Sequence, residues 1–229
     1  MTSTYAVRIE SETLDRVQIR ELCESGKSVH LTGCDLSGID LSGIELICWR
    51  LDKCLLSDAK MTSAILEDVS LLRCRAAEVQ LRGARLMSCR VENCDFSNAS
   101  FFEAGLTDVS ITGSRFLGVN CSQARVSNLT LMQSNFSLSR LEGVSFKGHV
   151  FEEIDFSQAD LSRCDFRLAK FNGCSLRDVQ LERTRFEQAD LRGADLAGFR
   201  PGELSYFKGA IISDRQAAVF VAQLGLKVA

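Results

Sequence analysis

Apolar residues recur at every fifth position through most of the chain. Stepping by five from Leu31 to Leu196 gives 34 positions, all of which are apolar, and 28 of them are Leu or Phe. Because 45% of all residues are apolar, chance would produce such a run about once in 10^12 sequences. An α-helix repeats every 3.6 residues and a strand every two. The pattern therefore predicts a repeated five-residue unit.

A second inward position lies two residues before each large one. Of these 34 positions, 28 hold Ala, Cys, Val, Ser or Thr. Side chains two apart on an extended segment point to the same side. Each unit is thus expected to bury one large and one small side chain and to expose its other three residues. Trp49 and His149 occupy small positions, and their rings predict a locally distorted face.

Glycine marks a third position, two residues after the large one. Eleven of the sixteen glycines lie there, among them Gly33, Gly143 and Gly193. A residue that is free to take a positive φ suits a tight turn. Each unit is therefore predicted to be a short extended face followed by a corner.

Like residues also recur every twenty positions. Phenylalanine does so at Phe96, Phe116, Phe136 and Phe156, and cysteine at Cys34, Cys54, Cys74 and Cys94. Four units per coil would stack each set in a column, with coils about 4.8 Å apart. The result is a rod of about 8.5 coils, about 40 Å long, whose interior is filled by side chains and has no room for a substrate.

Several units resemble the A(D/N)LXX unit of the pentapeptide-repeat proteins, notably Cys34 to Gly38, Ala159 to Arg163 and Ala194 to Gly198. The resemblance covers residues 29–198 and implies an all-β fold, a right-handed quadrilateral β-helix with four faces per coil. Together with short capping helices read from the residues at both ends, we expect an N-terminal cap at 1–28, a β-helix at 29–200 and a C-terminal segment at 201–229.

Both ends of a solenoid need caps, because they expose unpaired backbone. A helix is expected between Ser11 and Ser25, with Leu14, Val17 and Leu22 on one face and Gly26 as its stop. After Pro201 and Gly202, a strand is expected from Leu204 to Ile212. A capping box at Ser213 to Gln216 then starts a last helix that ends at Gly225.

This last helix has two interpretations. It is a lid on the last coil, or it is the contact of a homodimer. The dimer is favoured because the apolar residues exceed what one small end needs to cover, and the C-terminal segment mediates dimers in several members of the family that the repeats resemble. The predicted interface consists of Phe220, Val221, Leu224 and Leu226.

Composition argues against several functional classes. The formal net charge is −3, so direct binding to nucleic acid or to an anionic membrane is not expected. Ten cysteines and two histidines show no CxxC pair and no zinc-like spacing, which predicts no metal and no cofactor. Only His30 and His149 could serve as a base near neutrality, so no catalytic residues and no enzyme are predicted. The first five residues lack a secretory pattern, so a cytoplasmic protein with reduced thiols is expected.

One face of the predicted rod is acidic. Seven carboxylates lie on it against three arginines, Arg75, Arg115 and Arg177. The carboxylates, the candidate partner-binding residues, are Asp35, Asp58, Glu78, Asp95, Asp155, Asp178 and Asp195. Alternatively, an Asp just before the large residue bonds to nearby backbone and has no partner role.

The segment from Ile212 to Phe220, continuing to Gly225 and Leu226, is similar to the C-terminal end of the MfpA branch of the family. The resemblance to the Qnr and MfpA branch implies a dimeric DNA mimic that binds DNA gyrase or topoisomerase IV and protects it from quinolones or natural poisons. With 27 basic against 30 acidic residues, the imitation of DNA is weak. The alternative is a structural scaffold that binds an unrelated protein through one face.

Overall fold

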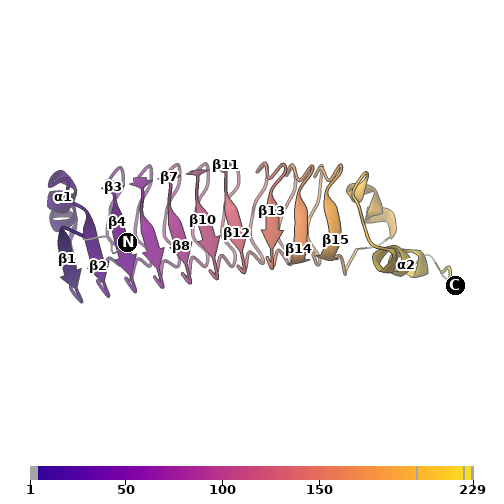
Figure 1. The fold of residues 1–229 in the computed structure, drawn as a ribbon, viewed down its shortest axis with the longest axis horizontal. Helices are drawn as coiled ribbons and strands as arrows, with labels where there is room; N and C mark the ends of the chain where they lie inside the picture. Colours follow the sequence, from indigo (N-terminus) through magenta and orange to yellow (C-terminus); the bar gives the residue numbers. More distant parts are fainter. Residues whose placement is uncertain (1–4, 200, 224, 228–229) are drawn as a thin grey trace.

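The structure is a computed structural model, which describes residues 5–199, 201–223 and 225–227. The chain winds into an elongated stack of coils with helices at its two ends (Figure 1). Ten strands form one parallel sheet along the whole stack: β1 Val7–Glu10, β2 Val29–Thr32, β4 Trp49–Asp52, β6 Ser70–Leu72, β8 Arg90–Glu92, β10 Ser110–Thr112, β12 Thr130–Met132, β13 Val150–Glu152, β14 Lys170–Ser175 and β15 Asp190–Asp195. Five strands form a second parallel sheet: β3 Glu45–Ile47, β5 Ile65–Glu67, β7 Arg85–Met87, β9 Gly105–Thr107 and β11 Arg125–Ser127.

Each coil takes twenty residues. From β2 to β13, paired residues are twenty apart, as in Val29 opposite Trp49. The two remaining faces follow the same rule through isolated bridges, such as Asp35 to Leu55 and Asp40 to Lys60. The predicted all-β solenoid with four units per coil is therefore confirmed.

Each of the four faces sends a column of large side chains and a column of small ones into the interior. Ring centroids of Phe96 and Phe116 lie 5.1 Å apart, those of Phe116 and Phe136 4.7 Å, and those of Phe136 and Phe156 5.9 Å. The predicted vertical stack is thus present. Trp49 is only 2% exposed and keeps regular strand pairing, so the distortion expected there is absent. The indole fits because one column accepts a ring between two smaller neighbours, Val29 and Val69.

The corners explain the glycine pattern. Every residue at the glycine position between Gly33 and Gly198 has a φ near +60° or somewhat above, except Gly193. Gly193 lies within β15, and a Cβ there would approach Phe171 O at 2.8 Å. Its glycine therefore permits close backbone packing instead of the predicted positive φ.

The five-stranded sheet stops at β11. Among the described residues, no β-bridge and no backbone hydrogen bond joins 124–129 to 145–150, the segments that we call the seam. One coil earlier, Asp108 N–H donates to Ser127 O at 3.0 Å. The inward residues Val126, Leu129 and His149 are only half-buried at the seam. The distortion predicted for His149 is therefore found in its neighbourhood.

The N-terminal cap differs in detail from the prediction. Helix α1, Arg16–Glu24, starts with a capping box between Asp15 and Gln18. The buried residue of the helix is Ile19 (1% exposed), whereas Val17, predicted to pack, is 62% exposed. The helix starts just after Leu14, which is itself buried, and from there it directs Ile19 instead of Val17 toward the core. Strand β1 extends the main sheet by one coil and has no counterpart in the five-residue pattern.

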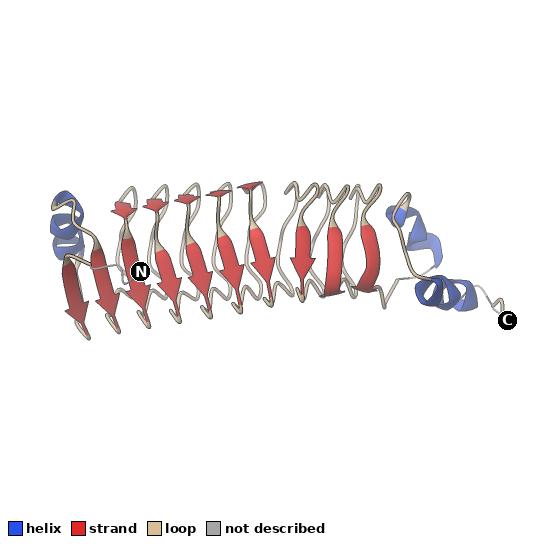
Figure 2. Cartoon of the chain, viewed as in Figure 1, coloured by secondary structure: helices blue, strands red, loops and turns tan. Residues whose placement is uncertain are grey.

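The described part of the C-terminal cap consists mainly of two helical segments. The strand predicted from Leu204 to Ile212 is wrong: Pro201–Phe207 forms a 3-10 helix, η1, and only Ile211 bridges to Asp190. Proline favours a helical first position because its φ is fixed. The predicted capping box is present, since Ser213 N–H donates to Gln216 Oε1 at 2.7 Å and starts α2, Asp214–Gln223. Figure 2 shows both helical segments beyond the last strand. No helix in the described ranges is both long enough and apolar enough to cross a membrane.

Candidate binding surface

The seven predicted carboxylates lie in two neighbouring columns. In-register bridges place Asp35, Asp95, Asp155 and Asp195 in one column, interleaved with Arg75 and Arg115. Asp58, Glu78 and Asp178 lie at the adjacent corners with positive φ and are exposed. The structure thus brings all seven onto one side of the rod, and their role in partner binding stays a prediction.

The first column also has a local structural role. Oδ1 of Asp35, Asp95 and Asp155 each accepts the backbone N–H two residues later at 2.9 Å. Asp195 accepts the Ala197 N–H at 2.9 Å and pairs with Arg177 at 3.0 Å. The Ser37 side chain and backbone N–H lower the pKa of Asp35, and the Ala197 N–H and Arg177 lower that of Asp195. The carboxylates of this column therefore fix their own turns, which leaves both interpretations of the column open.

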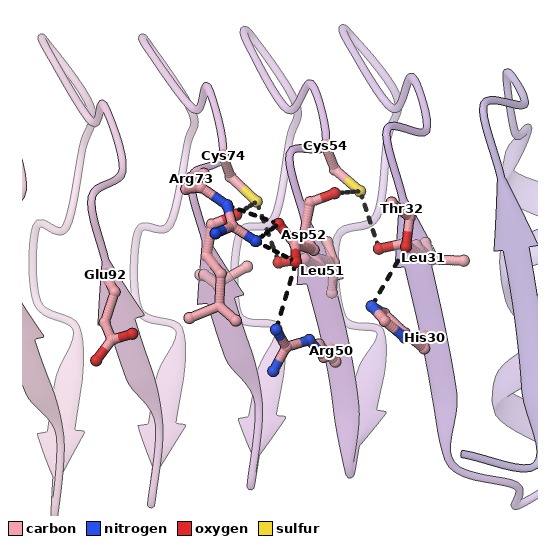
Figure 3. A network of polar contacts seen from close by, with 12 residues as sticks. His30, Leu31, Thr32, Arg50, Leu51, Asp52, Cys54, Arg73, Cys74 and Glu92 are labelled. Carbon is pink, nitrogen blue, oxygen red and sulfur yellow. Dashed lines mark hydrogen bonds and ion pairs between the residues drawn. The ribbon is translucent and has the colours of Figure 1, made fainter. Parts of the chain in front are cut away.

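Sequence reasoning missed a buried ion pair network on the ten-stranded sheet (Figure 3). The carboxylate of Asp52, 10% exposed, contacts Arg73 Nη2 at 2.6 Å and Arg50 Nη2 at 3.3 Å. Burial acts to raise the pKa of Asp52, but the hydrogen bonds from Arg73 and Arg50 outweigh it and hold the pKa below its ordinary value. The signal was available, because Arg73 lies one coil and one residue beyond Asp52. The network ties two coils together.

The two histidines belong to separate places and not to a common site. The His30 ring is tilted by 46° against the Tyr5 ring, with centroids 5.2 Å apart. His30 Nε2 lies 3.3 Å from Thr32 Oγ1 (Figure 3). Burial, Arg50 and Arg8 lower the pKa of His30. His149 Nδ1 lies 3.3 Å from Lys147 O at the seam, and its Nε2 is buried without a partner.

Seven of the ten cysteines occupy small inward positions, and all seven are buried. Burial raises the pKa of Cys89 to about 11 and that of Cys164 to about 12, so these thiols are poor nucleophiles. Within the described ranges, no group of three or more His, Cys, Asp or Glu could hold a metal ion. Two voids along the core measure about 20 and 30 Å³, which is close to the size of one water molecule.

The predicted dimer residues divide between lid and surface. Phe220, 7% exposed, packs on the core, and Gln216 Nε2 donates to Leu191 O and Ala194 O, both at 2.8 Å. Val221 is half-buried and Leu226 is 60% exposed, while Leu224 lies outside the described residues. Val219, which was not predicted, is 53% exposed. The helix is thus a lid that also presents apolar side chains outward.

The sequence profile of pentapeptide repeats matches eight copies over residues 54–93, 80–118, 134–173, 150–188 and 174–198. The chain belongs to the pentapeptide-repeat family. Members of this family generally act as structural or protein-binding proteins. No curated protein matches the chain.

Solved pentapeptide-repeat proteins are among the structures that the chain matches, at low identity and at TM-scores below 0.5. HetL, involved in heterocyst differentiation regulation in the cyanobacterium Nostoc sp. Strain PCC 7120, is 21% identical with a TM-score of 0.48, covering 81% of this chain and 99% of HetL. QnrB1, a plasmid-mediated fluoroquinolone resistance protein, is 19% identical with a TM-score of 0.48, covering 96% of this chain and 98% of QnrB1. Rfr23 from the cyanobacterium Cyanothece 51142 is 16% identical with a TM-score of 0.45, covering 56% of this chain and 91% of Rfr23. Similarity at this level carries no functional argument.

Proposed function

We propose that this pentapeptide-repeat protein is a non-enzymatic binding rod that acts as a homodimer and imitates duplex DNA toward a type II topoisomerase, DNA gyrase or topoisomerase IV. The observation that carries the proposal is the acidic face, which runs from Asp35 on the first coils to Asp195 on the last. A filled interior favours binding on the outer surface, because no described core cavity could enclose a substrate.

The geometry also sets how good the imitation is. Two rods of about 40 Å, joined tail to tail, would span about 80 Å, or about two turns of duplex. DNA carries about one charge per 1.7 Å of axis, whereas one rod has seven carboxylates and three arginines on this face. The acidic face is therefore much less densely charged than the duplex that it would imitate.

The test is a gyrase supercoiling assay with purified dimer, with and without a quinolone. We expect micromolar dimer to inhibit supercoiling or to reduce quinolone-stabilised cleavage. The absence of both effects at that concentration would refute the topoisomerase proposal. A variant with Asp58→Asn, Glu78→Gln and Asp178→Asn removes three exposed charges that make no turn-fixing bond. The concentration that this variant needs for the same effect on gyrase should rise by tenfold or more.

A matched variant controls for general charge. Glu67→Gln, Asp68→Asn and Glu182→Gln also removes three exposed carboxylates, from the other faces. It should behave as the wild type. Equal losses in the two triple variants would show that the acidic face has no special role.

The second candidate function is a scaffold for an unrelated protein, which the small excess of acidic residues favours. Affinity capture from the host lysate distinguishes the topoisomerase proposal from the scaffold proposal. Gyrase or topoisomerase IV subunits retained by wild type and lost in the Asp58, Glu78, Asp178 variant support the first proposal. Another stoichiometric partner with the same dependence supports the scaffold.

A further inference from the structure

A hollow lies on the five-stranded sheet, on a different side of the rod from the acidic face. Its volume is about 560 Å³, and it is lined mainly by residues of β7, β9 and β11. Arg85 and Arg125 both pair with Gly105, one from each side. Three consecutive coils therefore present an arginine, a residue without a side chain and a second arginine.

The backbone conformation does not require a glycine at position 105. It lacks the positive φ of the corner glycines, and nothing lies within 4 Å of the point where a Cβ would be. Any strand-forming residue would fit there, and most would fill the hollow. The open space between the arginines is thus a property of this one position.

Among the described residues, the two arginines have no acidic partner. No carboxylate lies within ion pair distance of Arg85 or Arg125 in the described part of the chain. Six other outward arginines contact an acid at 3.0 Å or less: Arg73, Arg90, Arg163, Arg167, Arg177 and Arg192. Glu103 on the rim is 3.8 Å from Arg82. The guanidinium groups at the hollow are therefore free to bind an anion.

The spacing suits a phosphate group. The Cα atoms of Arg85 and Arg125 are two coils, or about 10 Å, apart, so two flexible side chains can reach one anion from opposite sides. A guanidinium group binds phosphate with parallel N–H donors. Thr107 and Ser127 add hydroxyl groups to the lining, and Met87 and Val126 add apolar contact.

We propose that the hollow over Gly105 binds a phosphate group between Arg85 and Arg125. The phosphate comes from free inorganic phosphate or from a small ester whose body lies on Met87 and Val126. This site does not depend on the topoisomerase proposal, since it uses a different face and positive instead of negative charge.

The test is an NMR titration of the arginine Nε–H signals with inorganic phosphate and, separately, with phenyl phosphate. We expect saturable shifts of the Arg85 and Arg125 signals with a Kd of about 1 mM for inorganic phosphate. Equal affinity for the two probes assigns the site to inorganic phosphate, and tenfold tighter binding of phenyl phosphate assigns it to an ester. No saturable shift with either probe would overturn the proposal.

Four variants distinguish a specific phosphate site from general electrostatic attraction. Arg85→Gln and Arg125→Gln should each weaken binding by tenfold or more, and Arg183→Gln on another face should leave it unchanged. Gly105→Val keeps both charges, fills the hollow and should also weaken binding by tenfold or more. If the folded Gly105→Val protein binds as the wild type does, the hollow is not the site.

Discussion

At the residue scale, the five-residue unit depends on a corner that most side chains adopt at a cost. Non-glycine residues in the left-handed region cost about 1–2 kcal/mol. The chain nevertheless places bulky residues there, including Leu138 (φ +59°) and Leu168 (φ +63°). Their side chains are about half exposed, so they do not recover the cost by burial. Cooperation with neighbouring coils holds these corners.

Replacing a glycine at a corner should therefore affect stability more than replacing a glycine on a face. Gly148 has φ +73° and open space around it, whereas Gly105 has open space without a positive φ. We expect Gly148→Ala to lower the free energy of unfolding by about 1 kcal/mol and Gly105→Ala to leave it unchanged or slightly higher. Urea denaturation of the two variants checks this, and equal losses would contradict it.

The Asp52 network predicts a pH dependence. Because the folded-state pKa of Asp52 lies below its ordinary value, the stabilisation is complete above about pH 4 and is lost as the pH falls below it. We expect Asp52→Asn to cost about 2 kcal/mol at pH 7 and progressively less below pH 4. Urea midpoints of both proteins between pH 3 and 7 give the difference, and a constant gap over that range would contradict the ion pair interpretation.

At the element scale, the periodic positions predicted the coil well and the irregular ones poorly. Large residues five apart and phenylalanines twenty apart specify inward direction and stacking, because each is repeated in every coil. The seam, the η1 helix and the exposed Val17 have no such repetition. Their structure depends on which neighbouring backbone groups are available for hydrogen bonding and packing, and a single sequence does not carry that information. The Asp52 network is different, because the spacing of 21 residues between Asp52 and Arg73 could have been read from the sequence.

The seam should be the first part of the rod to open. We expect the Asn128 amide to exchange with solvent at least about tenfold faster than the Asp108 amide, its equivalent one coil earlier, because only the latter donates to the following coil. Hydrogen exchange followed by NMR tests this directly. Comparable protection of the two amides would mean that the seam is closed in solution.

At the scale of the whole molecule, the C-terminal cap decides how long a surface the protein presents. Phe220 and Gln216 fasten α2 to the last coil, which leaves Val219 and Leu226 outward. One rod alone covers about one turn of duplex. The proposed mimicry over two turns therefore requires the dimer.

Disrupting these outward side chains should yield a folded monomer. We expect Val219→Glu combined with Leu226→Glu to reduce the solution mass from twice 25.3 kDa to that of one chain, measured by light scattering during gel filtration. Val150→Glu, at an apolar position of the solenoid that is 46% exposed, should leave the mass unchanged. A wild type that already runs as one chain would remove the dimer from the proposal.

The twenty-residue coil also constrains how the chain can change its length. Deleting residues 101–120 would remove one coil and shorten the rod by about 4.8 Å, while every downstream column kept its alignment. Deleting a single five-residue unit would instead turn the remainder of the rod by a quarter, and Asp155 and Asp195 would leave the line of Asp35. Lineages that preserve a functional face can therefore gain or lose only whole coils.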